Sequence, residues 1–174
     1  CVIGLTAFAL RRYNRATRAD EGLIAGEQAY EQAQWEKAAK HLGQYLGVNK
    51  TDIPVILKYA EAQLKIRPLE RSNIQQAISS YRLVLRQDPD TTEAADKITG
   101  LYLQMGMPGE AELIARRRLG LTDDKPDPNA PDTEAIDPID SPRLRRVLAA
   151  ALARQQKFDE AAQLPLMDKE PGDE

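Results

Sequence analysis

The chain has 174 residues, of which 42% are hydrophobic, 29% charged and only 5% aromatic. This length suffices for one ordinary domain or for three to four helical hairpins of about 34 residues each. The net charge of −3 argues against a general nucleic-acid-binding protein. One Cys and one His cannot supply the roughly four ligands of a structural zinc site, so we expect no metal and no other cofactor.

The first ten residues, CVIGLTAFAL, carry no charge, and four arginines follow within the next eight. Ten residues rise only about 15 Å as a helix, half of what a bilayer core requires. We interpret residues 1–19 as a partial transmembrane anchor, beginning inside the span, with a basic juxtamembrane segment. A buried core helix and a secretory signal with a small-x-small site at Ala7 to Ala9 are competing interpretations. The arginines favour a cytoplasmic location for the rest of the chain, and a periplasmic location stays open.

Helix signals follow one another along the rest of the chain, whereas no run alternates β-branched or aromatic residues with polar ones. Asp20 and Glu21 suggest a helix start, Thr51 to Pro54 a cap followed by Pro in the first turn, and Gly106 a break. The fold class is therefore predicted to be all-α. The expected helices cover residues 20–34, 35–46, 53–66, 72–86, 93–105, 108–119, 142–156 and 158–164.

An acidic, Pro-rich stretch separates the last two expected helices from the others. Between Leu121 and Pro142 the chain has five Pro, seven acidic residues and one Lys. Such a composition cannot make a core, so it predicts a loop or tether. A more specific interpretation is that this stretch packs against the helices as a strap, with its acidic side chains in contact with nearby arginines. The acids concerned are Asp132, Glu134, Asp137 and Asp140, and the arginines are Arg143, Arg146 and residues 116–118.

A short phrase with a small residue at a fixed point recurs four times, as QWEKAAKHL, NIQQAISSY, MPGEAELIA and KFDEAAQLP. Its alanines are Ala38, Ala77, Ala111 and Ala161. A small residue with apolar neighbours at helical spacing lets two helices approach closely. Recurrence of such a unit is typical of a solenoid, in which no unit buries its apolar face alone.

These copies resemble the 34-residue helix–turn–helix of tetratricopeptide-repeat (TPR) proteins. The matching residues are Gly26, Trp35, Ala38 and Leu42; Ala60, Ala77, Tyr81 and Pro89; Tyr102, Gly106, Ala111 and Ala115; and, more loosely, Leu148, Ala149, Phe158 and Ala161. The resemblance covers residues 20–164. It implies three to four helical hairpins in a right-handed superhelix. We expect repeats one to three in 20–120, the loop in 121–141 and a degenerate, truncated fourth repeat in 142–174.

The spacing of the four alanines tests this resemblance. They lie 39, 34 and 50 residues apart (77−38, 111−77 and 161−111). Against a period of about 34, the two surpluses fall in an enlarged turn around residues 67–73 and in the acidic loop. Insertions are tolerated in loops, so both surpluses agree with the predicted repeats.

The resemblance also implies which residues face a ligand, because this family binds partners with the first helix of each repeat. These positions carry Leu23, Glu27, Tyr30, Glu31, Leu57, Glu61, Leu64, Lys65, Asp96, Gly100, Leu103 and Gln104. Family members that clamp a terminal carboxylate have Lys and Asn at several such sites, whereas this chain has mainly Glu, Asp and Leu. The pattern therefore favours a protein partner with a basic or amphipathic segment.

No residue pattern suggests catalysis. Trp35 is expected to pack between helices, and His41 to lie on the surface without a carboxylate or Cys at ligand spacing. Cys1 lacks the neighbouring cations of an activated thiol. No phosphate-binding Gly-rich loop, nucleophile elbow or zinc-binding helix is present. The sequence predicts a non-catalytic, membrane-tethered TPR adaptor, and the alternative is the TPR module of a larger enzyme or of a secretion or assembly machine.

Overall fold

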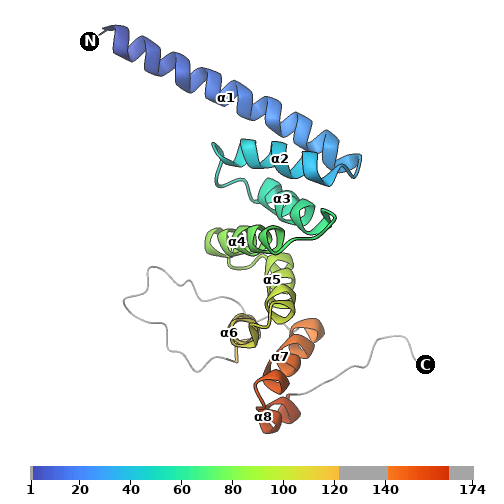
Figure 1. Ribbon diagram of the computed structural model, residues 1–174. Helices are drawn as coiled ribbons and strands as arrows, with labels where there is room; N and C mark the ends of the chain where they lie inside the picture. The colour runs from blue at the N-terminus through green and yellow to red at the C-terminus, as the bar shows by residue number, and fades with distance from the viewer. Residues whose placement is uncertain (1, 122–140, 165–174) are drawn as a thin grey trace, which may run out of the picture. The chain divides into compact units, whose positions relative to one another are not determined.

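The computed structural model describes the backbone of residues 2–121 and 141–164, with side chains from Thr17 onward. Within these ranges the chain forms eight helices and no strand, which confirms the predicted all-α fold (Figure 1). They are α1 (Val2–Glu31), α2 (Trp35–Leu46), α3 (Ile53–Lys65), α4 (Arg71–Gln87), α5 (Thr92–Gln104), α6 (Pro108–Arg118), α7 (Pro142–Arg154) and α8 (Phe158–Gln163). The chain divides into two compact units, Cys1–Gln87 (unit 1) and Asp88–Glu174 (unit 2).

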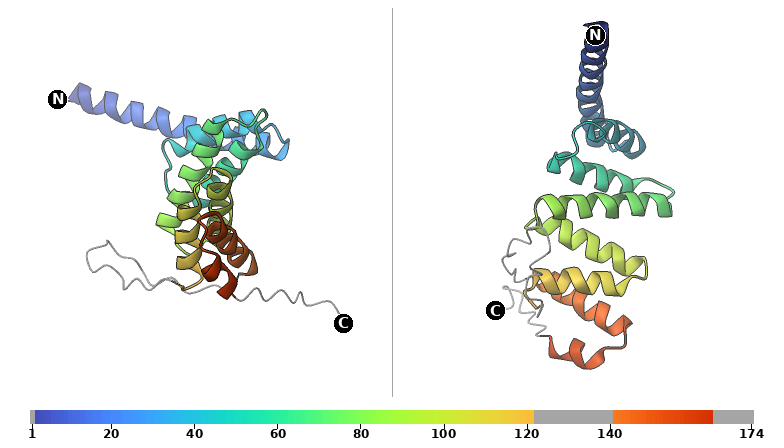
Figure 2. Two further views of the ribbon diagram at one scale, coloured as in Figure 1. Left: turned by 60° about the horizontal axis from the view of Figure 1, so that its bottom comes forward. Right: turned by 90° about the vertical axis from the view of Figure 1, so that its left-hand side faces the viewer.

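Unit 1 consists of two antiparallel hairpins, α1–α2 and α3–α4 (Figures 1 and 2). The second helix of the first hairpin, α2, also packs against the first helix of the next, α3. Sequential pairing with stacking of this kind is what the recurring phrase predicts. The enlarged turn is present as well, because α3 ends at Lys65 and α4 begins only at Arg71.

The start of α1 differs from the prediction. The acidic pair Asp20 and Glu21 suggested a helix start, but α1 is continuous from Val2 to Glu31. Acidic residues are favourable in a first turn, yet they are also tolerated inside a helix of good helix formers such as Ala, Leu and Arg.

Among the helices that the structure describes, none combines the length and the apolar composition that a bilayer crossing requires.

The signature alanines lie at close helix contacts, as predicted. Ala38, Ala77 and Ala111 are fully buried. The α1–α2 contact is also close, because a Cβ atom added at Gly26 would lie 2.6 Å from Leu42 Cδ2. Ala161 is only half-buried, so the fourth copy of the phrase packs less completely than the others.

The predicted start of α3 is confirmed at the atomic level. Asp52 caps the helix, since its Oδ1 accepts a hydrogen bond from Val55 N at 3.3 Å. The other carboxylate oxygen accepts one from the Tyr45 hydroxyl at 2.8 Å. This bond ties the end of α2 to the start of α3 and raises the pKa of Tyr45, because the neutral phenol is the donor.

Unit 2 contains the α5–α6 and α7–α8 hairpins, with α7 packed against both α6 and α5. Ala115 of α6 and Leu148 and Leu152 of α7 form a buried cluster. Ala161 and Leu164 pack at its edge. The fourth hairpin therefore packs on the third through apolar side chains, although 23 residues of sequence (119–141) separate α6 from α7.

Charged side chains reinforce unit 2 at two places. Arg118 is 2% exposed and donates hydrogen bonds to Pro89 O at 2.9 Å and to Asp90 Oδ1 at 3.0 Å. Arg116 pairs with Glu112 at 2.7 Å and with Glu160. These arginines therefore have partners among the described residues of unit 2. The predicted contacts of Asp132, Glu134, Asp137 and Asp140 lie outside the described residues.

Candidate partner-binding surface

In unit 1, three of the predicted ligand-facing residues contact one another across α1 and α3. Tyr30 donates a hydrogen bond from its hydroxyl to Glu61 Oε2. Lys65 Nζ lies 2.7 Å from Glu61 Oε1. First helices of neighbouring repeats therefore share one face, as the family resemblance implies.

The acidic character of this face is largely balanced by lysines. Glu27 Oε1 lies 2.5 Å from the Nζ of Lys58, a residue outside the predicted ligand-facing positions. Glu61 is paired with Lys65. All four side chains remain partly exposed, between 34% and 42%. The face therefore presents ion pairs, which weakens the electrostatic reason for expecting a basic partner.

The apolar and the remaining acidic positions of unit 1 flank these pairs. Leu23, Leu57 and Leu64 are half-buried, and Glu31 is exposed. Half-buried leucines beside charged groups suit a segment that is apolar on one side and charged on the other.

Trp35 was expected in the core, but the structure gives it a mixed environment. It packs at the edge of a buried cluster formed by Ala29, Ala38, Ala39 and Ala62. Its ring meets the Tyr30 ring edge-on, with centroids 5.4 Å apart and planes at 84°. Lys65 Nζ lies 4.4 Å from the indole centroid, a cation–π contact. Trp35 is thus half-buried and part of the surface that includes Tyr30 and Lys65.

The predicted residues of unit 2 lie beside α7. Asp96 Oδ2 is 3.8 Å from Arg143 Nη1, while its Oδ1 is buried and has no hydrogen-bond partner among the described residues. The carbonyl oxygen of Leu103 accepts a hydrogen bond from Arg154 Nη1. Gln104 is exposed, and Gly100 has open space above its Cα atom. Arginines of α7 therefore lie against the face that the resemblance assigned to ligand binding.

Comparisons with known proteins give information on the fold alone. No known family model matches the sequence, and no curated protein matches it. Among solved structures, "Crystal structure of MamA" is similar with a TM-score of 0.60 and 15% identity, covering 84% of this chain and 73% of that chain. A second, "Crystal structure of MamA protein", has a TM-score of 0.40 and 13% identity, covering 84% and 87%. The first match shows that this chain has a TPR-like helical fold.

Proposed function

We propose that this protein is a non-catalytic scaffold that binds a partner protein on the shared α1–α3 face of unit 1. The observation that supports it most is the cluster of Tyr30, Glu61 and Lys65, which two successive repeats build together. A side-chain arrangement that spans repeats is available for recognition only in a stacked array. The TPR-like fold, shared with MamA, is consistent with this role.

The proposed partner segment is an amphipathic helix or peptide. Its apolar side would cover Leu23, Leu57 and Leu64, which are half-buried. Its polar side would meet the Glu27–Lys58 and Glu61–Lys65 pairs, which offer both signs of charge. A purely basic segment fits less well, because each of these glutamates already has a lysine partner.

The same proposal includes attachment to a membrane through residues 1–19, with the repeats in the cytoplasm. It is supported by the uncharged start of the chain and the arginines that follow it. Removal of residues 2–18 should shift the protein from the membrane fraction to the supernatant on centrifugation of lysed cells. Equal distribution of the two forms would contradict the tether and leave partner binding untouched.

Site-specific crosslinking tests partner binding. A photoreactive amino acid at Leu57, on the proposed face, should give one discrete crosslinked product in cells. The same amino acid at Ser79, an exposed position of α4, serves as the matched control. Crosslinks that are absent at Leu57, or equal at both positions, would count against the scaffold.

A further inference from the structure

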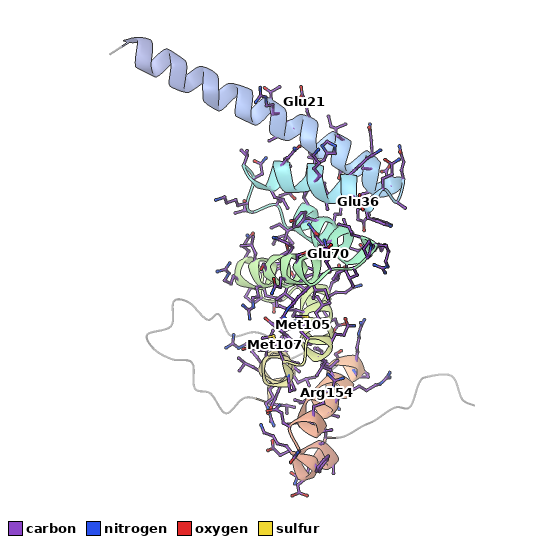
Figure 3. All side chains as sticks on the ribbon, viewed as in Figure 1. Glu21, Glu36, Glu70, Met105, Met107 and Arg154 are labelled. Atoms are coloured by element: carbon purple, nitrogen blue, oxygen red, sulfur yellow. The ribbon has the colours of Figure 1, made fainter. Side chains whose placement is uncertain are left out.

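An open pocket of about 400 Å³ lies between the start of α2 and the end of α3, within unit 1. The turns after α1 and after α3 lie at the same end of the unit, so the two repeats both contribute to it (Figure 1). Gln34 to Lys37 line one side, and Lys65 to Arg67 line the other. Glu36, labelled in Figure 3, marks this end of α2. The pocket is therefore assembled from residues about 30 positions apart in sequence (67−37).

The lining of this pocket carries an excess of positive charge. Lys37, Lys65 and Arg67 line the pocket together with one acidic residue, Glu36. Because Lys65 is already paired with Glu61, the local charge with this glutamate included is +1 (3−2), in a chain of net charge −3. The first turn of α2 adds to it, since Gln34 makes no side-chain cap and the helix dipole is positive at this end. The combination favours an anionic group.

Two of the three cations are held in place before any ligand arrives. Arg67 Nη1 donates hydrogen bonds to Leu64 O at 2.9 Å and to Ile66 O at 2.8 Å. A guanidinium has five N–H donors, so three others are left for an incoming carboxylate. Lys65 is oriented by Glu61 and by the face of Trp35. Such ordering lowers the entropy lost on binding.

The pocket also has an apolar part. The indole of Trp35 and the side chain of Ile66 line it, and both pack at the edge of the alanine cluster between α1, α2 and α3. A ligand with an aliphatic group next to its anionic group would meet both kinds of lining. Aromatic rings are effective contact surfaces for such groups, since they bury a large area at low entropy cost.

We propose that this pocket binds a carboxylate of the partner segment, with a neighbouring aliphatic side chain against Trp35. The inference rests on the scaffold function proposed above and names one anchoring point of the partner. A peptide is favoured over a nucleic acid because Glu36 lies in the pocket lining and Glu61 is paired with Lys65 beside it. A row of phosphates would meet these acids, whereas a single carboxylate needs only the local cations.

Trp35 provides a direct readout, because it is the only Trp in the chain. Its fluorescence is followed while the full chain is titrated with a short blocked peptide containing Leu-Glu between Gly and Ser residues. The same peptide with Gln in place of Glu is the ligand control, and a third peptide ends in Leu with a free carboxylate. The Glu peptide should bind about three- to tenfold more tightly than the Gln peptide, and binding should weaken with added salt. If the third peptide binds more tightly than the Gln peptide, this result also supports carboxylate binding in the pocket. It then indicates that the carboxylate belongs to a chain terminus.

Charge reversals then locate the binding site. Lys37→Glu and Arg67→Glu should each weaken binding of the Glu peptide about three- to tenfold. Lys40→Glu is the matched control, since it makes the same charge change on the exposed side of α2 outside the pocket lining. Lys37 is exposed, so its variant stays informative if Arg67→Glu alters the end of α3.

Three results would overturn the inference. They are equal binding of the Glu and Gln peptides, equal weakening by Lys40→Glu, and tighter binding of a single-stranded oligonucleotide than of the Glu peptide. Crosslinking at Leu57 distinguishes a failure of the pocket proposal from a failure of the proposed scaffold function. If the Lys37→Glu variant still forms the partner crosslink while Trp35 fluorescence does not respond to the peptides, the proposed scaffold function stands. The proposed role of the pocket is then wrong.

Discussion

The replacement of Gly26 by Ala is the most direct test of the close α1–α2 contact. In an exposed helix interior this change is favourable by about 1 kcal/mol, because Ala has the higher helix propensity. At Gly26, however, the added Cβ atom would lie 2.6 Å from Leu42 Cδ2, 2.9 Å from its Cγ and 3.0 Å from its backbone nitrogen. Carbon atoms normally pack about 3.5–4.0 Å apart. Two opposing effects therefore act at this one position.

The steric effect should win. Rotation of the Leu42 side chain would move Cδ2, but the contact with the backbone nitrogen persists unless α2 itself shifts. Leu42 is fully buried, so its side chain has little space to move into. Overpacking of this kind costs about 1–3 kcal/mol, and we take the upper end. With the propensity gain subtracted, Gly26→Ala should lower the free energy of unfolding of unit 1 by about 2 kcal/mol.

Gly100→Ala is the matched control, because it makes the same chemical change inside α5. No atom lies within 4 Å of a Cβ added there, so only the propensity gain of about 0.5–1 kcal/mol remains. Urea unfolding followed by Trp35 fluorescence reports unit 1, and far-ultraviolet circular dichroism reports the helices of both units. A Gly26→Ala protein as stable as the parent would refute the reasoning.

Two further predictions concern unit 2. Ala111→Leu should cost about 1–3 kcal/mol in urea unfolding, since Ala111 is fully buried, and an unchanged midpoint would show that the repeat register is wrong. Burial of Glu112 raises its pKa, but the hydrogen bonds that it accepts from Arg116, Lys157 and Gln155 have the larger, opposite effect. The net pKa of Glu112 is therefore below the usual 4.5. Its contribution to stability is present above that usual value and is lost as the pH falls through the lowered pKa. Glu112→Gln should therefore cost about 1–2 kcal/mol at neutral pH and much less in acid, and an equal cost at both pH values would contradict this.

The sequence predicted best those features that depend on residue size at helical spacing. The burial of Ala38, Ala77 and Ala111 follows directly from the recurring phrase, because only small residues permit the close helix contacts. The break at Gly106 was also predictable, and its φ of +71° is a value that glycine adopts readily. The start of α1 was not, because acidic residues do not by themselves end a helix that precedes them.

The candidate surface was predictable only in part, since it depends on the register between repeats. Glu27 and Lys58 are 31 positions apart and meet only because α1 and α3 share a face. The pocket beside Trp35 joins Lys37 to Arg67 for a similar reason, because the turn before α2 and the turn that contains Arg67 lie at the same end of unit 1. A comparison of residues one repeat apart would have suggested both groupings. The half-exposed setting of Trp35 would still have been missed, because burial depends on how completely α3 covers the ring.

The direct packing of α7 on α6 bears on how this gene can change. Side chains such as Ala115, Leu148 and Leu152 pack the two helices directly against each other. The entropy of closing a connection grows only with the logarithm of its length, by about 0.6 kcal/mol for each doubling. An entire foreign domain inserted between residues 121 and 141 would thus burden the hairpins very little. Evolution can lengthen, shorten or replace this connection while the helical packing on either side stays under its own selection.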